Sequence, residues 1–172
     1  MPAAPSPASQ AGTAAPAYWP AGLPRHLVLP ATNVAANLAL SAARAPEQTA
    51  LLYFGRRISY RELNTEVDAL AGWMQQRAGL QRGDRVLLQM QNCPQFVAAF
   101  YAILRADAVV VPASPMLLAG ELRYLLDDSG AQVVFTSQEL LANWTPLHDE
   151  GKPAQMVVAC HADRAGDDVI EA

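Results

Sequence analysis

The stretch Arg85-Val86-Leu87-Leu88-Gln89-Met90 decides the fold, because its middle has the apolar character of a strand buried on both faces. Pro94 follows, after Asn92 or Cys93, at a position typical of a first helical residue, and 95–106 is then a largely apolar helix. Val109-Val110-Val111 is a short apolar strand that ends at Pro112. A strand, a helix and a second strand in this order predict a βαβ unit with parallel strands.

The same alternation continues on both sides of this unit. Downstream we expect a helix ended by Gly130, a strand, a short helix and a last strand, at residues 118–127, 132–135, 138–143 and 156–159. Upstream we expect a helix that Thr32 or Asn33 caps and Pro46 ends, and a hairpin with strands at 50–54 and 57–59 around a Gly55-Arg56 turn. The predicted fold class is α/β, with a mostly parallel sheet flanked by helices.

A long helix follows the hairpin and runs to about Arg77. Ser59 and Glu62 have the spacing of a capping box at its start, and Gly79 is expected to cap its end. Its apolar residues recur on one face, at Leu63, Val67, Leu70 and Met74.

Composition excludes several classes of protein. The 172 residues are 52% hydrophobic and 16% charged with a net charge of −4, which argues against nucleic acid as the main partner. Cys93 and Cys160 lie too far apart for a disulfide scaffold or a paired-cysteine zinc site, and they fit a cytoplasmic protein. No apolar run reaches the roughly 18–20 residues of a membrane helix.

Residues 1–24 form a separate region in sequence. They carry no charge and are rich in Ala and Pro, so we expect a disordered tail, with 25–172 as the folded domain. Tyr18 and Trp19 are expected to anchor the end of this tail on the domain, and a loose aromatic pair is the alternative.

A parallel sheet directs the search for chemistry to the carboxyl ends of its strands. The 172 residues hold no Gly-rich nucleotide loop of either common pattern. Thr136 or Ser137 is expected to cap the next helix, Asp127-Asp128 to be a solvated helix end, and Ser59 to act as a cap rather than a nucleophile. His26, His148 and His161 have no evident partners, and the cluster Cys160-His161-Ala162-Asp163 is too compressed for a usual zinc geometry.

Two segments point to a family. Ile58-Ser59-Tyr60-Arg61-Glu62-Leu63 resembles the first core motif of the adenylate-forming (AMP-binding) superfamily, Leu-Thr/Ser-Tyr-x-Glu-Leu, with Ile in the first place. The stretch 102–112, from Ala102 to Pro112, resembles the second core motif, Leu-Lys-Ala-Gly-x-Ala-Tyr-Val-Pro, with Arg105 in place of Lys and Asp107 in place of Gly.

Further segments fit the same superfamily in order and spacing, and the resemblance covers 29–141. They are a Gly-Asp-Arg-Val strand entry at 82–86, an Asn-x-x-Gln-Phe helix start at 92–96, and the run from Glu121 to Phe135. The 92–96 and 112–116 stretches favour the fatty-acyl-CoA synthetase branch, of the long-chain-fatty-acid–CoA ligase type. Aryl-CoA ligases and amino-acid-adenylating enzymes share both core motifs and remain alternatives.

The resemblance implies a fold and an activity. The fold is that of the N-terminal part of the large domain of adenylate-forming enzymes. In that family a carboxylic acid and ATP, usually with Mg²⁺, give an acyl-adenylate, and CoA then takes the acyl group. The family's phosphate loop, a Thr/Ser/Gly-rich run ending in Pro-Lys-Gly, is absent from these 172 residues, as are its later nucleotide motifs and catalytic Lys.

No catalytic residue is therefore carried over, and no metal ligand. Ala113 and Ser114, in the turn after the second motif, are candidates for lying near CoA, with plain turn chemistry as the alternative. We expect an enzyme segment that is inactive by itself, whose partners are fatty acid, ATP, CoA and the remainder of the enzyme. A freestanding binding module that lacks the chemistry and an unrelated flavodoxin-like domain are the alternatives. The expected location is the cytoplasm, with peripheral membrane association as a variant.

Overall fold

The fold is described from a computed structural model, in which residues 20, 22–23, 26, 32–159 and 170–171 are placed well enough to describe. The chain divides into two units, 1–32 and 33–172. In the first unit, the Leu23 amide donates to the Pro20 carbonyl, and His26 is exposed. The predictions for residues 1–19, including Tyr18 and Trp19, and for the cluster 160–163 lie outside the described residues.

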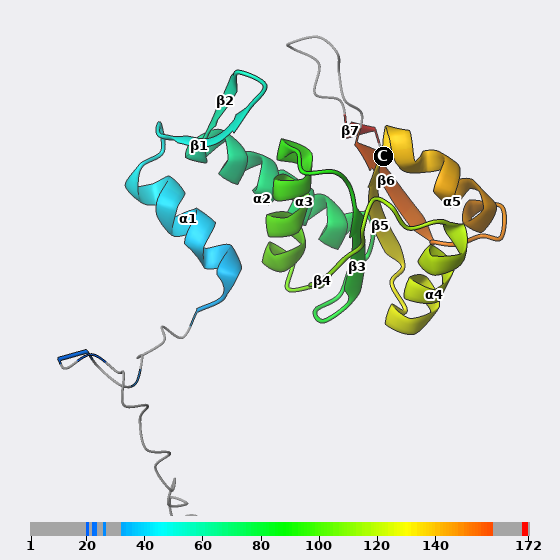
Figure 1. Cartoon of the computed structure of the whole chain (residues 1–172). Helices are drawn as coiled ribbons and strands as arrows, with labels where there is room; N and C mark the ends of the chain where they lie inside the picture. Colours follow the sequence, from blue (N-terminus) through cyan, green and yellow to red (C-terminus); the bar gives the residue numbers. More distant parts are fainter. Residues whose placement is uncertain (1–19, 21, 24–25, 27–31, 160–169, 172) are drawn as a thin grey trace, which may run out of the picture. The chain divides into compact units, whose positions relative to one another are not determined.

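The second unit is built on one sheet whose strand order is β4-β3-β5-β6-β7 (Figure 1). Four strands are parallel: β3 (Arg85–Gln89), β4 (Val109–Pro112), β5 (Val133–Ser137) and β6 (Gln155–Ala159). The two-residue β7 (Ile170–Glu171) pairs antiparallel with β6 and was not foreseen from the sequence. The mostly parallel α/β sheet is as predicted.

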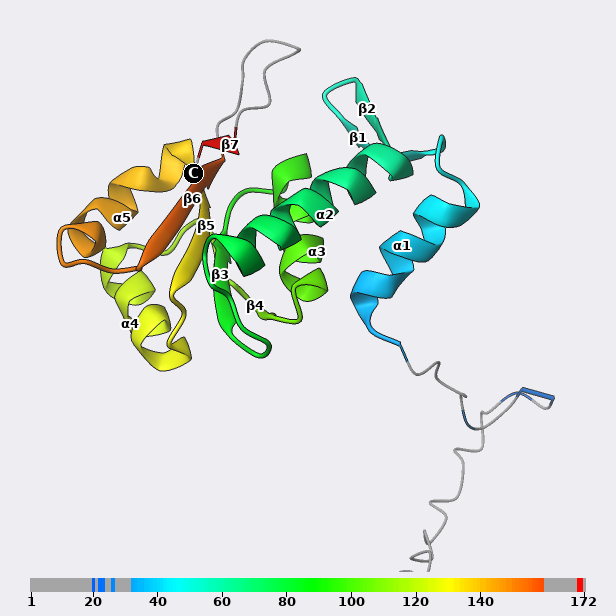
Figure 2. The same ribbon diagram turned by 180° about the vertical axis from the view of Figure 1, so that it is seen from behind.

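Helices cover both faces of this sheet, as Figures 1 and 2 show. One face carries α2 (Tyr60–Gln76) and α3 (Pro94–Arg105), and α1 (Val34–Arg44) packs on both of these helices. The other face carries α4 (Ala119–Ser129) and α5 (Leu141–His148), which follows the short 3₁₀ turn η1 (Gln138–Leu140). The helix predicted for 138–143 therefore continues beyond its expected end, through Pro146 to His148.

Two cores fill the spaces between the layers, because alternate residues of a strand point to opposite faces. Val86 and Leu88 of β3 belong to the core under α2 and α3, while Leu87 belongs to the core under α4 and α5. Residues 86–90 are all buried, which confirms the two-sided burial predicted for this strand. The second core is centred on Trp144, which is fully buried.

The hairpin of β1 (Thr49–Tyr53) and β2 (Arg56–Ser59) is present, but its turn is not the predicted Gly55-Arg56 pair. Tyr53 pairs with Arg56, so the turn residues are Phe54 and Gly55. Their φ angles are 43° and 85°, respectively. Two-residue turns with positive φ at both positions match the twist of a hairpin, and this preference places the turn one residue earlier than predicted.

Most helix ends follow local chemistry. The Asn33 side chain caps α1 by accepting from the Ala36 amide at 3.0 Å. Cys93 precedes α3, with Pro94 as its first residue, and Gly130 ends α4 in the left-handed region at φ 66°. The prediction for Gly79 was wrong: Arg77 is the C-cap of α2, and Gly79 takes φ 66° two residues later, where the chain turns toward β3.

No helix within the described part of the chain is both long enough and apolar enough to cross a membrane.

Candidate functional site at the carboxyl edge of the sheet

The connections of the sheet change direction between two neighbouring strands. From the carboxyl end of β3 the chain leads into α3 on one face, and from that of β5 it leads toward α5 on the other face (Figure 1). β3 and β5 are direct neighbours, with Gln89 opposite Thr136. Where neighbouring parallel strands connect to opposite faces, the carboxyl ends leave a crevice in which α/β proteins bind ligands.

Gln89 is the polar centre of this edge, and it is fully buried. Its Oε1 accepts a hydrogen bond from Trp144 Nε1 at 2.7 Å. Its Nε2 donates to the Ser114 carbonyl at 3.0 Å and lies 3.4 Å from the Leu117 carbonyl. One side chain on β3 thus fixes both the loop after β4 and helix α5. A buried amide with these partners is a positioning group, because its donors and acceptor are already used.

Ala113 and Ser114, the candidates for lying near CoA, stand at this same edge directly after β4. Ala113 is buried, and its amide donates to the Leu88 carbonyl at 2.9 Å. Ser114 is exposed, and its hydroxyl accepts from the Met116 amide at 3.2 Å. The loop is therefore held by its backbone, while the Ser114 side chain faces solvent and closes a local turn.

Neither Thr136 nor Ser137 caps the next helix through its side chain, contrary to the sequence prediction, although Ser137 occupies the N-cap position of the 3₁₀ turn η1. They are the last two residues of β5, both fully buried, and neither hydroxyl has a hydrogen-bond partner. The 3₁₀ turn that follows makes no side-chain cap bond. Gln95 Oε1, at the start of α3, is a third buried atom without a partner. Buried polar atoms are normally paired, so these three mark the edge as polar and incompletely satisfied.

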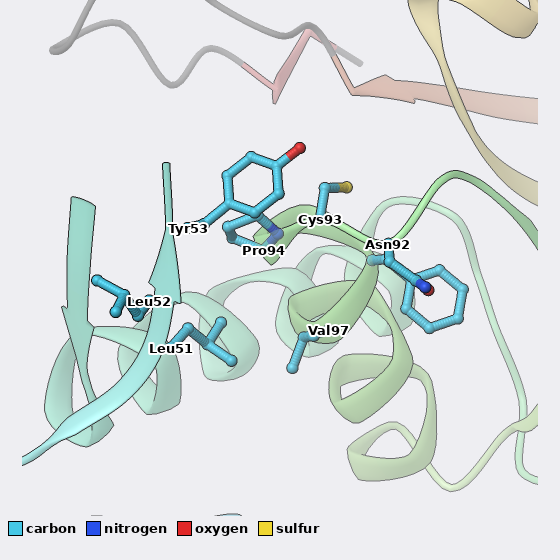
Figure 3. Close-up of a pocket in the computed structure, with 8 residues that line it drawn as sticks. Leu51, Leu52, Tyr53, Asn92, Cys93, Pro94 and Val97 are labelled. Atoms are coloured by element: carbon cyan, nitrogen blue, oxygen red, sulfur yellow. The ribbon is translucent and has the colours of Figure 1, made fainter. Parts of the chain in front are cut away.

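An apolar recess lies beside the start of α3 and has a volume of about 310 Å³ (Figure 3). Its walls come from β1 and from the β3–α3 junction, and the residues that line it are Leu51, Leu52, Tyr53, Asn92, Cys93, Pro94, Phe96 and Val97. Burial raises the pKa of the Cys93 thiol, the Gln95 and Phe96 amides act in the opposite direction, and Glu139 raises the pKa further. A raised pKa leaves this thiol protonated and poorly nucleophilic.

The remaining candidate residues do not converge on a catalytic group. Asp127 pairs with Lys152, and Ser59 is occupied in the capping box with Glu62. His148 lies at the end of α5 and is exposed. Within the described ranges, no three His, Cys, Asp or Glu side chains gather in a way that holds a metal ion.

The residues of the two core motifs have structural roles. Ile58–Leu63 forms the junction of β2 and α2, and 102–112 forms the end of α3 and the whole of β4. Arg105, which stands where the motif has Lys, ties α3 to α2 by donating to Asn64 Oδ1 at 3.0 Å and pairing with Asp68. Asp107, which stands where the motif has Gly, has φ 59°, the left-handed conformation that Gly adopts most easily.

A family model described as AMP-binding enzyme matches residues 38–171. The chain belongs to this AMP-binding enzyme family. A long-chain-fatty-acid–CoA ligase of Bacillus subtilis (strain 168) is 37% identical over 120 residues, which are 70% of this chain and 21% of that protein. A long-chain-fatty-acid–CoA ligase of Escherichia coli O157:H7 is 39% identical over 94 residues, 55% of this chain and 17% of that protein.

A solved structure shows the same fold. The crystal structure of a long-chain-fatty-acid-CoA ligase (FadD1) from Archaeoglobus fulgidus matches with a TM-score of 0.69 and 25% identity, over 77% of this chain and 28% of that one. The chain therefore spans between 17% and 28% of the length of these relatives. The family and the α/β fold predicted from the two motifs are confirmed.

Sequence reasoning missed the most connected residue of this edge. Gln89 is a polar residue inside a strand of otherwise apolar buried residues, and such a residue needs partners in the core. That pattern was available in the sequence. Its partners were not, because Trp144 is 55 residues away along the chain and meets Gln89 only through the folded sheet.

Proposed function

We propose that this chain is a segment of an ATP-dependent ligase that joins a long-chain fatty acid to CoA through an acyl-adenylate. The observation that carries the proposal is the AMP-binding family match over 38–171, together with relatives of 37–39% identity that are long-chain-fatty-acid–CoA ligases. ATP and CoA are the expected co-substrates, with Mg²⁺ on the phosphates, and the cytoplasm is the expected location.

The role we assign to the 172 residues is structural support of the reacting partners. The described residues offer no metal-binding cluster, and the sequence has no phosphate loop, so we assign no Mg²⁺ ligand and no phosphate contact to them. What they supply is a rigid carboxyl edge, in which Gln89 fixes the loop at Ser114 and Leu117. Other parts of the enzyme would then meet a fixed surface, which favours a defined geometry for reaction.

We further propose that Ala113 and Ser114 border the path of CoA. Support comes from their place directly after β4, at the edge where α/β proteins bind ligands, and from the exposure of Ser114. A bulky side chain at position 114 would narrow that path without affecting the ATP-dependent half of the reaction, which forms the acyl-adenylate.

The experiment starts by reading the gene past the codon for Ala172 and expressing the whole product. ATP–pyrophosphate exchange is then measured with hexadecanoate, benzoate and a mixture of amino acids, followed by thioester formation with CoA. We expect exchange to be strongest with hexadecanoate. Exchange with benzoate or amino acids alone would assign the protein to another branch, and a product without a phosphate loop and without exchange would make it a freestanding binding module.

Two further arms test the roles within this product. The 1–172 chain alone should give exchange no higher than background, and exchange above background would contradict the supporting role. Ser114→Trp should raise the KM for CoA at least five-fold while leaving pyrophosphate exchange unchanged. Leu40→Trp, at an exposed site on α1, is the matched control. An unchanged KM for CoA would refute the placement of CoA beside Ser114.

A further inference from the structure

The apolar recess beside α3 is larger than an ordinary gap in packing. Its volume is about 310 Å³, roughly ten times the space that one water molecule occupies in the liquid. Protein interiors leave few voids larger than a water molecule. Two segments that are distant in the sequence build the recess: residues 51–53 on β1, and residues from 92 to 97 at the start of α3. Figure 3 shows their side chains around one shared space.

The wall of this recess is mostly aliphatic. Of the eight lining side chains, four are aliphatic and two are aromatic, and only Asn92 carries an amide. Leu51, Phe96 and Val97 are half-buried and pack against the main core, so this part of the wall rests on a fixed support. Leu52 and Asn92 are exposed, so the recess is reached from solvent on their side.

The wall is also uncharged, because the described residues that line it include no Asp, Glu, Lys, Arg or His. Burial raises the pKa of the Cys93 thiol, which stays protonated and behaves as a small apolar group. The Glu139 carboxylate acts on this thiol and raises its pKa further. A carboxylate placed in the recess would be repelled by the same negative charge, so the surroundings favour a neutral molecule.

We propose that this recess binds the aliphatic chain of an uncharged molecule and has room for about ten carbon atoms. An apolar cavity of about 150 Å³ takes one benzene ring, so roughly twice that volume holds about ten to twelve carbons. A flexible chain can follow a wall built from side chains of different shapes, while its polar end stays in water on the side of Asn92. Removal of the chain from water then drives binding.

This inference goes beyond the proposed ligase function and does not depend on it. The recess lies between β1 and the start of α3, whereas the path assigned to CoA lies at Ser114, after β4. Its test requires neither ATP nor CoA. Failure of the test would therefore leave the ligase proposal standing, and failure of the ligase proposal would leave this one standing.

The test titrates the 1–172 chain with 1-alkanols of increasing chain length, from hexanol to dodecanol, by isothermal titration calorimetry. We expect the affinity to rise about four-fold for each added methylene and to level off at about ten carbons, where the recess is full. 1-Decanol should bind at least five-fold more tightly than decanoate, which tests a charged ligand, and than 2-naphthol, which tests an aromatic one.

Two substitutions change the size of the recess in opposite directions. Val97→Phe fills it from α3 and should weaken the binding of 1-decanol at least five-fold. Val34→Phe makes the same change at an exposed site on α1 outside the recess, and this matched control should bind like the wild type. Val97→Ala enlarges the recess and should lengthen the best-bound alkanol by about one or two carbons. Circular dichroism verifies the fold of each variant, and Val97→Ala decides the result if Val97→Phe does not fold.

Cys93 reports where the ligand sits. In a Cys160→Ser background, bound 1-decanol should slow the labelling of Cys93 by methyl methanethiosulfonate at least five-fold. Absence of binding by every alkanol, tighter binding of decanoate or 2-naphthol, or labelling that 1-decanol leaves unchanged would each overturn the proposal. Wild-type affinity in a folded Val97→Phe, or an unchanged best chain length in Val97→Ala, would overturn it as well.

Discussion

Ser59 and Glu62 close the first turn of α2 in both directions. The Ser59 hydroxyl accepts from the Glu62 amide at 3.2 Å, and the Glu62 carboxylate accepts from the Ser59 amide at 2.7 Å. Ser59→Ala removes the first of these bonds, and the loss of such a cap costs about 1 kcal/mol. We therefore expect a lower Tm for the 1–172 chain in thermal unfolding. Ser114→Ala is the control, and a Tm equal to the wild type in Ser59→Ala would contradict the role.

The same capping box predicts that the stability of the fold depends on pH. The bond from the Ser59 amide, followed by that from its hydroxyl, holds the pKa of Glu62 below its ordinary value. A carboxyl whose pKa is lower in the folded state stabilises the fold above its unfolded pKa, near 4.3, and loses that effect as pH falls through the folded pKa.

The Tm difference between wild type and Glu62→Gln measures this effect. We expect the difference to be constant from pH 7 to pH 5 and to shrink below about pH 4. Asp128→Asn, at an exposed carboxyl near the end of α4, provides the control. A Tm difference that grows as the pH falls would show that the pKa of Glu62 is raised, rather than lowered, in the folded state.

Asp107 offers a third test at the residue scale. It takes φ 59° between α3 and β4, at the position where the second core motif has Gly. A residue with a Cβ pays roughly 1–2 kcal/mol in this region, and Asp is one of the residues that tolerates it best. The order of Tm values should be Asp107→Gly at or above wild type and Asp107→Ala below it. The reverse order would mean that the Asp107 carboxylate contributes more to stability than the backbone angle of this residue does.

At the scale of elements, Gln89 links three parts of the fold. It joins β3 to the loop after β4 and to α5 through its bonds to the Ser114 carbonyl and Trp144 Nε1. Gln89→Leu would leave both of these groups unpaired, and a buried group without its partner costs about 1–3 kcal/mol.

We expect Gln89→Leu to lower the free energy of unfolding by about 2 kcal/mol or more. Gln138→Leu, at an exposed site, should change it by less than about 0.5 kcal/mol. Denaturant unfolding followed by tryptophan fluorescence measures both. A loss in Gln89→Leu no larger than in the control would show that the network contributes nothing to stability.

The elements that were predicted correctly from the sequence are those that depend on residues close to one another along the chain. Three features rest on neighbouring residues, and the structure contains each of them: the burial of 86–90, the start of α3 at Pro94 and the capping box at Ser59. The hairpin turn was misplaced by one residue because Phe54 does not signal a positive φ. The length of α5 was underestimated because Pro146 lies inside it, where proline usually ends a helix.

The carboxyl edge was harder to predict, since it depends on contacts between distant segments. The motifs identified the family and placed Ala113 and Ser114 after a strand, but they did not reveal the bond between Gln89 and Trp144. Thr136 and Ser137 have the sequence of helix caps and instead end a buried strand. Their burial arises from the strands on both sides of β5, which local pattern does not report.

At the scale of the whole molecule, the open edge of the sheet governs behaviour in solution. β4 is the outermost strand and pairs with β3 alone among the strands that the structure describes. Val109 on this strand is 48% exposed, and a bare strand edge with apolar side chains is a template for pairing with another chain. We therefore expect the 1–172 chain to self-associate at micromolar concentration and to bind a dye specific for apolar surface.

Val109→Lys separates the edge from other exposed apolar sites, because a charge on an edge strand opposes pairing. It should shift sedimentation velocity profiles toward the monomer and leave the Tm within about 3 °C of wild type, since Val109 is half exposed. Leu40→Lys, at a 64% exposed site on α1, is the matched control and should leave self-association unchanged. A wild-type chain that stays monomeric, binds no dye and unfolds in one sharp transition would show that the edge of β4 is stable without a partner.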